Sequence, residues 1–215
     1  MKSIPLLAFA LVLATPTLAR ADQSATFHGG TTDAENASVS QLSSYLVSRY
    51  PTAASAERAG YFRYTNADET GAISYANMQW YSQDLQHPSQ LWYDKDGKLL
   101  GADYSVPLAA SATRPALWGV NPGRWVEFDA HIHWVAKDAS TGAMLYDQWA
   151  WDKDFTAAGG DPDHPTAVAL VAMKKVTSTS DVVRVFHFPA IWDLIVWVRP
   201  NPNGAFAWKN PSVTP

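Results

Sequence analysis

The chain has 215 residues, no cysteine and a formal net charge of −4 at pH 7. This length fits one domain with a sizeable core, and the absence of cysteine excludes a fold held together by disulfides. A weakly acidic chain without a basic run argues against nucleic acid as a partner.

The first residues have the pattern of a signal peptide. Lys2 precedes an apolar run over residues 4–14 that is too short to cross a bilayer, and the segment ends in the small-x-small sequence Ala19-Arg20-Ala21. We therefore expect cleavage before Asp22 and export to the periplasm or the exterior.

One domain is predicted after this peptide. Residues 22–31 are small and polar and are expected to form a flexible N-terminus, and residues 32–215 form the domain. No later stretch has the apolar length of a membrane span.

Two helices are predicted at the start of the domain. Thr32 and Glu35 have the spacing of a capping box, and apolar residues then recur at helical intervals as far as Tyr50. Pro51 ends this helix, and a shorter one fits residues 52–59.

From residue 61 onward, alternation replaces helical spacing and predicts antiparallel strands. The expected strands cover residues 61–65, 72–81, 89–93, 98–106, 125–137, 143–151, 182–188 and 191–198. Two further helices are expected over 152–158 and 165–175. The last two strands are nearly continuous apolar runs, which predicts burial on both faces.

These elements predict an α+β fold of one domain. We expect a curved antiparallel sheet, as a half-barrel or sandwich, with the N-terminal helix pair and the 165–175 helix packed on it.

The predicted strand over residues 125–137 carries the candidate site. Alternation places Glu127, Asp129, His131 and His133 on one face and apolar side chains on the other. Two imidazoles two positions apart on a strand lie close enough to bind one metal ion.

A further ligand is predicted on the partner strand, residues 143–151. Pairing Lys137 with Ala143 across the intervening turn places Asp147 opposite His133. A shift of this register by one residue would remove Asp147 from the face.

These donors are typical of a catalytic metal centre. His131, His133 and Asp147, with Asp129 beside them, match the ligand types of zinc or non-haem iron, and copper(II) accepts the same donors. The alternative is an outer strand face whose carboxylates only meet water.

Three residues are predicted to support the candidate metal ligands. Asp193 is a lone acid within an apolar strand, and a buried carboxylate requires a partner, for which His187 is a candidate. Such a pair would orient the His187 imidazole toward the cluster, and Glu127 would assist from the same strand as the histidines. The alternative is a hydrogen-bonded core pair without a functional role.

Three functions remain open from the sequence. The first is an exported protein that binds a small ligand in an aromatic-rich pocket containing the His-x-His face, with Trp149 and Trp151 as a stacking platform. The second is an exported metal-dependent hydrolase or oxidase that uses His131, His133 and Asp147, and the third is a non-catalytic envelope component. The signatures of serine hydrolases, nucleotide-binding proteins and zincins are missing from the sequence. The sequence names neither a ligand nor an oligomeric state.

Overall fold

The structure is a computed structural model that describes residues 30–68, 70–81 and 84–213. The predicted signal peptide, its cleavage point and residues 22–29 of the predicted flexible N-terminus lie outside the described residues. Within the described ranges, no helix is both long and apolar enough to cross a membrane.

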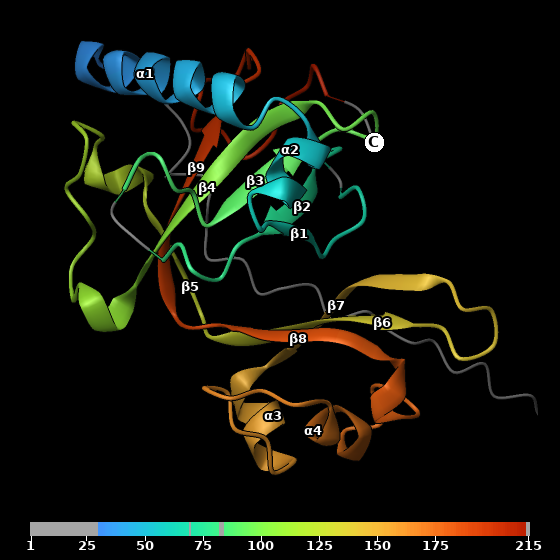
Figure 1. Ribbon diagram of the computed structural model, residues 1–215. Helices are drawn as coiled ribbons and strands as arrows, with labels where there is room; N and C mark the ends of the chain where they lie inside the picture. The colour runs from blue at the N-terminus through green and yellow to red at the C-terminus, as the bar shows by residue number, and fades with distance from the viewer. Residues whose placement is uncertain (1–29, 69, 82–83, 214–215) are drawn as a thin grey trace, which may run out of the picture.

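Four layers of secondary structure stack on one another (Figure 1). Helix α1, Asp33–Arg49, lies over one face of a six-stranded antiparallel sheet, and a three-stranded antiparallel sheet lies beyond the other face. Helices α3, Asp152–Ala157, and α4, Ala167–Ala172, cover the far side of the small sheet. The predicted α+β class is confirmed, and neither sheet closes into a barrel.

The strand order of the large sheet is β1-β2-β3-β4-β9-β5, and that of the small sheet is β7-β6-β8. The strands of the large sheet are β1 Phe62–Arg63, β2 Ile73–Ala76, β3 Gln90–Tyr93, β4 Leu99–Pro107, β9 Ile191–Trp197 and β5 Val126–Phe128. The strands of the small sheet are β7 Met144–Trp151, β6 His131–Lys137 and β8 Val182–Phe188.

Helix α1 begins with the predicted capping box. The backbone N–H of Glu35 donates to Thr32 Oγ1 at 3.1 Å, and the backbone N–H of Thr32 donates to Glu35 Oε2 at 2.9 Å. The chain leaves the helix at Pro51, and α2, Ala53–Arg58, follows within the predicted range.

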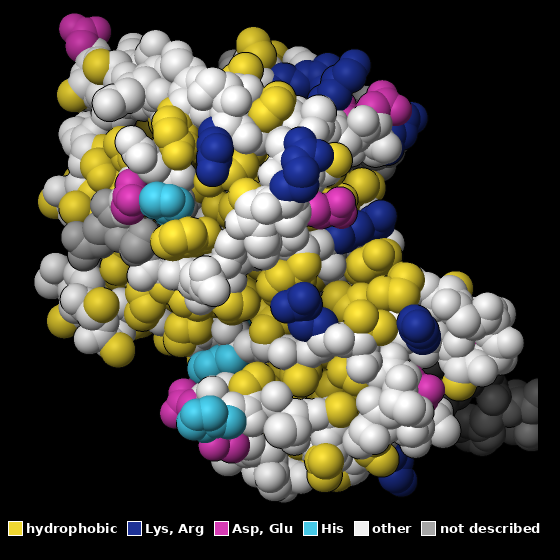
Figure 2. All heavy atoms as spheres, in the orientation of Figure 1, with side chains coloured by type: hydrophobic (Ala, Val, Ile, Leu, Met, Phe, Trp, Pro, Cys, Tyr) yellow, Lys and Arg dark blue, Asp and Glu magenta, His cyan; other side chains and the backbone are white. Residues whose placement is uncertain are grey.

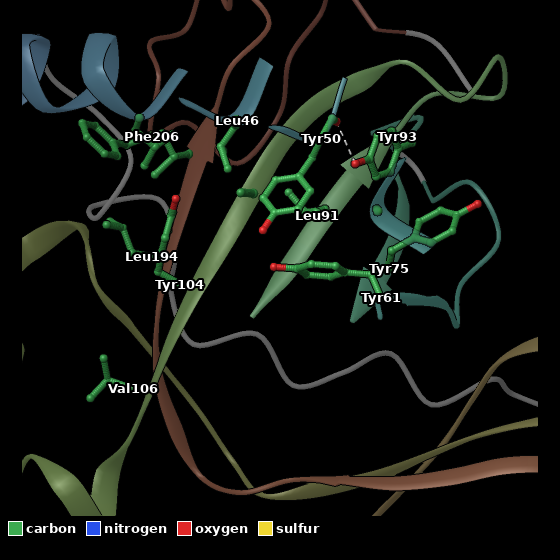
Figure 3. Close-up of a cluster of buried hydrophobic side chains, with 14 of the residues drawn as sticks. Leu46, Tyr50, Tyr61, Tyr75, Leu91, Tyr93, Tyr104, Val106, Leu194 and Phe206 are labelled. Atoms are coloured by element: carbon green, nitrogen blue, oxygen red, sulfur yellow. Dashed lines mark hydrogen bonds between the residues drawn. The ribbon is translucent and has the colours of Figure 1, made fainter. Parts of the chain in front are cut away.

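The main hydrophobic core lies between α1 and the large sheet (Figure 3). Leu46 and Tyr50 point from the end of the helix toward Leu91 and Tyr93 on β3, and the Tyr93 hydroxyl donates to the Tyr50 carbonyl at 2.9 Å. This face of the sheet is therefore filled by side chains, and its opposite face is the one that meets the small sheet.

The predicted strand over residues 125–137 is wrong as a single element. Its first part, β5, pairs with β9 in the large sheet, and its second part, β6, pairs with β7 and β8 in the small sheet. A bend at Asp129-Ala130 separates them, and a second bend at Pro189-Ala190 separates β8 from β9. Proline has no N–H to donate to a strand ladder, so Pro189 suits a bend at which strands change sheets.

The expected burial of the last two strands is confirmed for β9 and wrong for the first half of β8. All residues of β9 are buried, because this strand lies inside the large sheet between β4 and β5. Strand β8 is an edge strand, and Val183 is 53% exposed.

Helix α4 is shorter than the predicted 165–175 helix. Thr166 has an extended backbone before the helix, and Lys174 after it has a positive φ of 59°.

Candidate functional site

A cavity of about 320 Å³ lies between the two sheets. Strands β3, β4 and β9 of the large sheet provide one wall, and β6, β7 and β8 of the small sheet provide another. On the face of the molecule in Figure 2, hydrophobic side chains gather across the middle, where the two sheets meet.

Aromatic rings form much of the cavity wall. They belong to Tyr64, Trp92, Phe128, Trp149, Phe188, Trp197 and Trp208. The rings of Trp92 and Trp197 meet edge to face with their centroids 5.3 Å apart. This packing gives the cavity a rigid apolar surface.

Two buried carboxyl groups lie in the same wall. Asp103 on β4 and Asp193 on β9 are each 5% exposed, and their strands are neighbours in the large sheet. Asp193 is paired in register with Ser105, two positions from Asp103, so both carboxyl groups are on the cavity face. We call Asp103 and Asp193 the acid pair.

Each member of the acid pair accepts one hydrogen bond from a side chain. Trp92 Nε1 donates to Asp103 Oδ2 at 2.9 Å, and the Ser105 hydroxyl donates to Asp193 Oδ1 at 2.8 Å. Asp103 Oδ1 is buried and has no hydrogen-bond partner among the described residues.

Burial makes the acid pair difficult to ionise. It raises the pKa of Asp103 well above its usual range, and the nearby Asp193 charge raises it further. Burial also raises the pKa of Asp193 to about 7. The described residues that line the cavity include no Lys or Arg, so the pair has no cationic side chain beside it.

The predicted His-x-His face is present and lines the cavity. The rings of His131 and His133 point to the same side, with centroids 4.9 Å apart. His131 Nδ1 donates to the backbone carbonyl of Asp129 at 2.7 Å, and since a carbonyl only accepts, the neutral ring carries its lone pair on Nε2.

Both imidazoles favour the neutral form. Burial lowers the pKa of His131, and it lowers the pKa of His133 well below the usual value, with an added contribution from His131. His133 Nδ1 is buried without a hydrogen-bond partner in the described part of the chain.

The predicted register between β6 and β7 is wrong. His133 lies opposite Trp149 rather than Asp147, because Lys137 pairs with Met144 instead of Ala143 and a bulge between Trp134 and Ala136 adds a second shift of one residue. Asp147 has a positive φ of 60° in this bulge.

Asp147 nevertheless lines the cavity as an exposed residue. Its backbone N–H donates to the Tyr64 carbonyl at 3.0 Å, and its Oδ2 atom accepts from the backbone N–H of Asn66 at 2.9 Å. These bonds tie Asp147 to the segment after β1.

The other predicted carboxylates of the histidine strand are elsewhere. Glu127 and Asp129 are exposed and are not part of the cavity wall. The bend at Asp129-Ala130 interrupts the alternation on which their placement depended, and Phe128 lines the cavity together with the two histidines.

The predicted aromatic platform is present in part. Trp149 lines the cavity and Trp151 lies beside it, outside the lining, with their ring centroids 4.9 Å apart and their planes at 81°. The two rings therefore meet edge to face, and Trp149 alone offers a surface to a ligand in the cavity.

The predicted pairing of His187 with Asp193 is wrong. His187 Nε2 lies 2.8 Å from Asp152 Oδ2, at the start of α3, while Asp193 accepts from Ser105. Alternation along β8 directs His187 away from Phe186 and Phe188, which pack against the cavity histidines.

Sequence reasoning missed Asp103, Gln90 and Tyr64 as site residues. The Tyr64 hydroxyl donates to Gln90 Oε1, and both side chains line the cavity. Asp103 had a signal in the sequence, because it is an isolated acid within the strand predicted over residues 98–106, as Asp193 is within its own strand.

A metal centre of three protein ligands is not formed in the described ranges. There, no three His, Cys, Asp or Glu side chains lie close enough together to hold one ion. The two imidazoles are adjacent, but Asp147 is held by its bonds to residues 64 and 66.

No protein-family model matches this chain, and neither a curated protein nor a solved structure is detectably similar to it. The function therefore has to follow from the cavity itself, with its aromatic wall, its acid pair and its two neutral imidazoles.

Proposed function

We propose that this protein is exported and binds a small molecule in the cavity between its two sheets. The observation that carries this proposal is that Asp103 Oδ1 and His133 Nδ1 are buried polar atoms of the cavity wall without partners in the described chain. Folded proteins leave few such atoms, because each one costs about 1–3 kcal/mol. A ligand that bonds to these atoms removes that cost.

The size and lining of the cavity support the same proposal. Its volume of about 320 Å³ lies at the lower end of ligand pockets, which span roughly 300–1,000 Å³ and combine apolar walls with a few polar groups. A non-catalytic envelope component, the third function left open by the sequence, requires no such cavity.

Binding can be tested through tryptophan fluorescence, since the described lining of the cavity includes Trp92, Trp149, Trp197 and Trp208. The probes are phenethyl alcohol, phenethylammonium and phenylacetate, which share one aromatic ring and differ in charge. We expect at least one of them to change the fluorescence saturably and to raise the unfolding temperature.

A cavity-filling variant locates this binding. Ala72 is 4% exposed and lines the cavity, so Ala72→Leu places a larger side chain inside it. Ala143 is exposed in the hairpin after β6, and Ala143→Leu is the matched control. Binding that survives Ala72→Leu unchanged, or no binding of any probe, contradicts the proposal.

The metal-dependent alternative has its own test. It requires a further ligand beside the two imidazoles, which the described residues do not bring together. Elemental analysis of the purified protein and of His131→Ala would support this alternative if stoichiometric zinc, iron or copper were present and were lost in the variant.

Export is tested by N-terminal sequencing. We expect the mature protein recovered outside the cytoplasm to begin at Asp22, and a mature chain that retains Met1 contradicts this part of the proposal.

A further inference from the structure

We infer that the ligand is a small organic cation, with a primary ammonium group between Asp103 and Asp193 and an apolar body against the tryptophans of the cavity. This inference rests on the proposed function and names the chemical class of the ligand. It follows from three features of the cavity wall, namely its charge, its open hydrogen-bond acceptors and the position of its aromatic rings.

The acid pair has no cationic partner in the described cavity lining, and this absence keeps it from ionising. Both carboxyl groups of the acid pair are buried, and in the described lining there is no Lys or Arg to balance them. His131 and His133 do not replace such a cation, because burial lowers the pKa of both rings. A bound cation supplies the missing positive charge, whereas a bound anion adds to the repulsion.

Once the acid pair is ionised, its open hydrogen-bond positions are acceptors. Trp92 and Ser105 each satisfy one oxygen, which leaves Asp103 Oδ1 without a donor among the described residues. A primary ammonium group carries three N–H donors. One of these can bond to Asp103 Oδ1 and another to Asp193, which a quaternary ammonium cannot do.

Aromatic rings lie directly beside the acid pair. Trp92 bonds to Asp103, and the ring of Trp92 also meets that of Trp197 across Gly101, two positions from Asp103 on β4. The Trp92 ring lies so close to Gly101 that a Cβ atom at this position would be 2.9 Å from the ring. A cation held by the carboxylates thus lies beside indole rings, which offer an apolar surface to the body of the ligand.

The experiment compares matched probes by calorimetry at about pH 8, where the acid pair is more ionised. Phenethylammonium is the cation, phenethyl alcohol its neutral analogue and phenylacetate the anion, and phenethyltrimethylammonium keeps the charge without N–H donors. We expect phenethylammonium to bind about tenfold or more tightly than the other three.

Substitutions locate the preference. Asp193→Asn and Asp103→Asn each remove an ionisable carboxyl group with little change of shape, and each is expected to reduce the preference for the cation over the alcohol to about threefold or less. Both variants are prepared in case one of them does not fold. Either variant that folds is sufficient to test the preference for the cation. Asp163→Asn, in an exposed loop, is the control and should bind as the wild type does.

The outcomes separate this inference from the proposed function. If the alcohol or phenylacetate binds as tightly as the cation and Ala72→Leu abolishes that binding, the cavity is a ligand site but the inferred class is wrong. If phenethyltrimethylammonium binds as tightly as phenethylammonium, the assignment of a primary ammonium is wrong. If no probe binds, both the inference and the proposed function fail.

Discussion

The buried Asp193 carboxyl group should make the folded protein less stable as the pH rises. Asp193 is 5% exposed and accepts a hydrogen bond from Ser105. Its pKa is about 7 in the folded chain, against an ordinary aspartate value of 3.8 in the unfolded chain. The folded state therefore binds this proton more tightly than the unfolded state does. The perturbation that isolates this effect is Asp193→Asn, which removes the titration and keeps the shape.

The magnitude follows from the separation of the two pKa values. Below about pH 4 the proton is bound in both states and the group contributes no pH dependence. Between the two values, each pH unit lowers the free energy of unfolding by about 1.4 kcal/mol, which sums to about 4 kcal/mol once the pH exceeds 7. The wild type should therefore lose about 4 kcal/mol more than Asp193→Asn between about pH 4 and pH 8.

Urea unfolding at a series of pH values measures this difference. The other titratable groups of the cavity wall are present in both proteins; they are Asp103, His131, His133, Tyr64, Asp68 and Asp147. Because the Asp193 charge raises the pKa of Asp103, the same comparison is repeated in the Asp103→Asn background, where that coupling is absent. Asp163→Asn again serves as the control, and its curve should follow the wild type. Parallel curves for the wild type and Asp193→Asn would refute the account of a buried acid without a counterion.

Three further predictions concern the rigidity of the fold and the charge of the site. Gly101→Ala would place a Cβ atom 2.5 Å from the Val196 carbonyl oxygen and 2.9 Å from the Trp92 ring. We expect urea unfolding to show that the free energy of unfolding falls by about 1–3 kcal/mol. An unchanged unfolding midpoint would contradict this. Arg124→Met leaves the Glu35 carboxylate, which is 1% exposed, without the guanidinium group 3.1 Å away. We expect the free energy of unfolding to fall by about 3–5 kcal/mol. A fall of less than about 1 kcal/mol would show that this ion pair does not stabilise the fold. Phenethylammonium should bind more tightly as the pH rises from about 6 to 8, because it replaces a proton on the acid pair; calorimetry in buffers of different ionisation enthalpy should detect that released proton, and binding independent of pH would argue against the replacement.

Local sequence signals were sufficient for the elements that depend on near neighbours. The capping box of Thr32 and Glu35 and the turn between the strands at 89–93 and 98–106 involve residues a few positions apart, and the structure contains both elements. The antiparallel class followed from the alternation of side chains and from the short turns between successive strands.

The errors occurred where distant segments decide the outcome. The bend at Asp129-Ala130 exists because β5 and β6 find partners in different sheets. The bulge at Asp147 is held by bonds to Tyr64 and Asn66, about eighty positions earlier in the chain. No pattern within one strand carries this information, so the predicted alternation and register were wrong there.

The acid pair itself also lay beyond local reasoning. Asp103 and Asp193 become neighbours only because β9 returns to lie beside β4, and Ser105 and Asp193 are 88 residues apart. Each acid was visible as an exception within its own apolar strand. The sequence contained both exceptions, but it did not contain the strand order that joins them.

A last prediction separates a functional acid pair from a structural one. If the pair were there to stabilise the fold, Asp103→Asn would weaken folding and ligand binding together. If the pair exists to hold a cation, removing one buried carboxyl group should leave stability at about pH 8 unchanged or higher. The same change should weaken phenethylammonium binding about tenfold or more. Urea unfolding and calorimetry on the same preparation measure both quantities, and a fall in both would assign Asp103 to the architecture of the large sheet. Opposite signs are expected because Asp103 is buried without a cation while its Oδ1 atom still lacks a donor among the described residues.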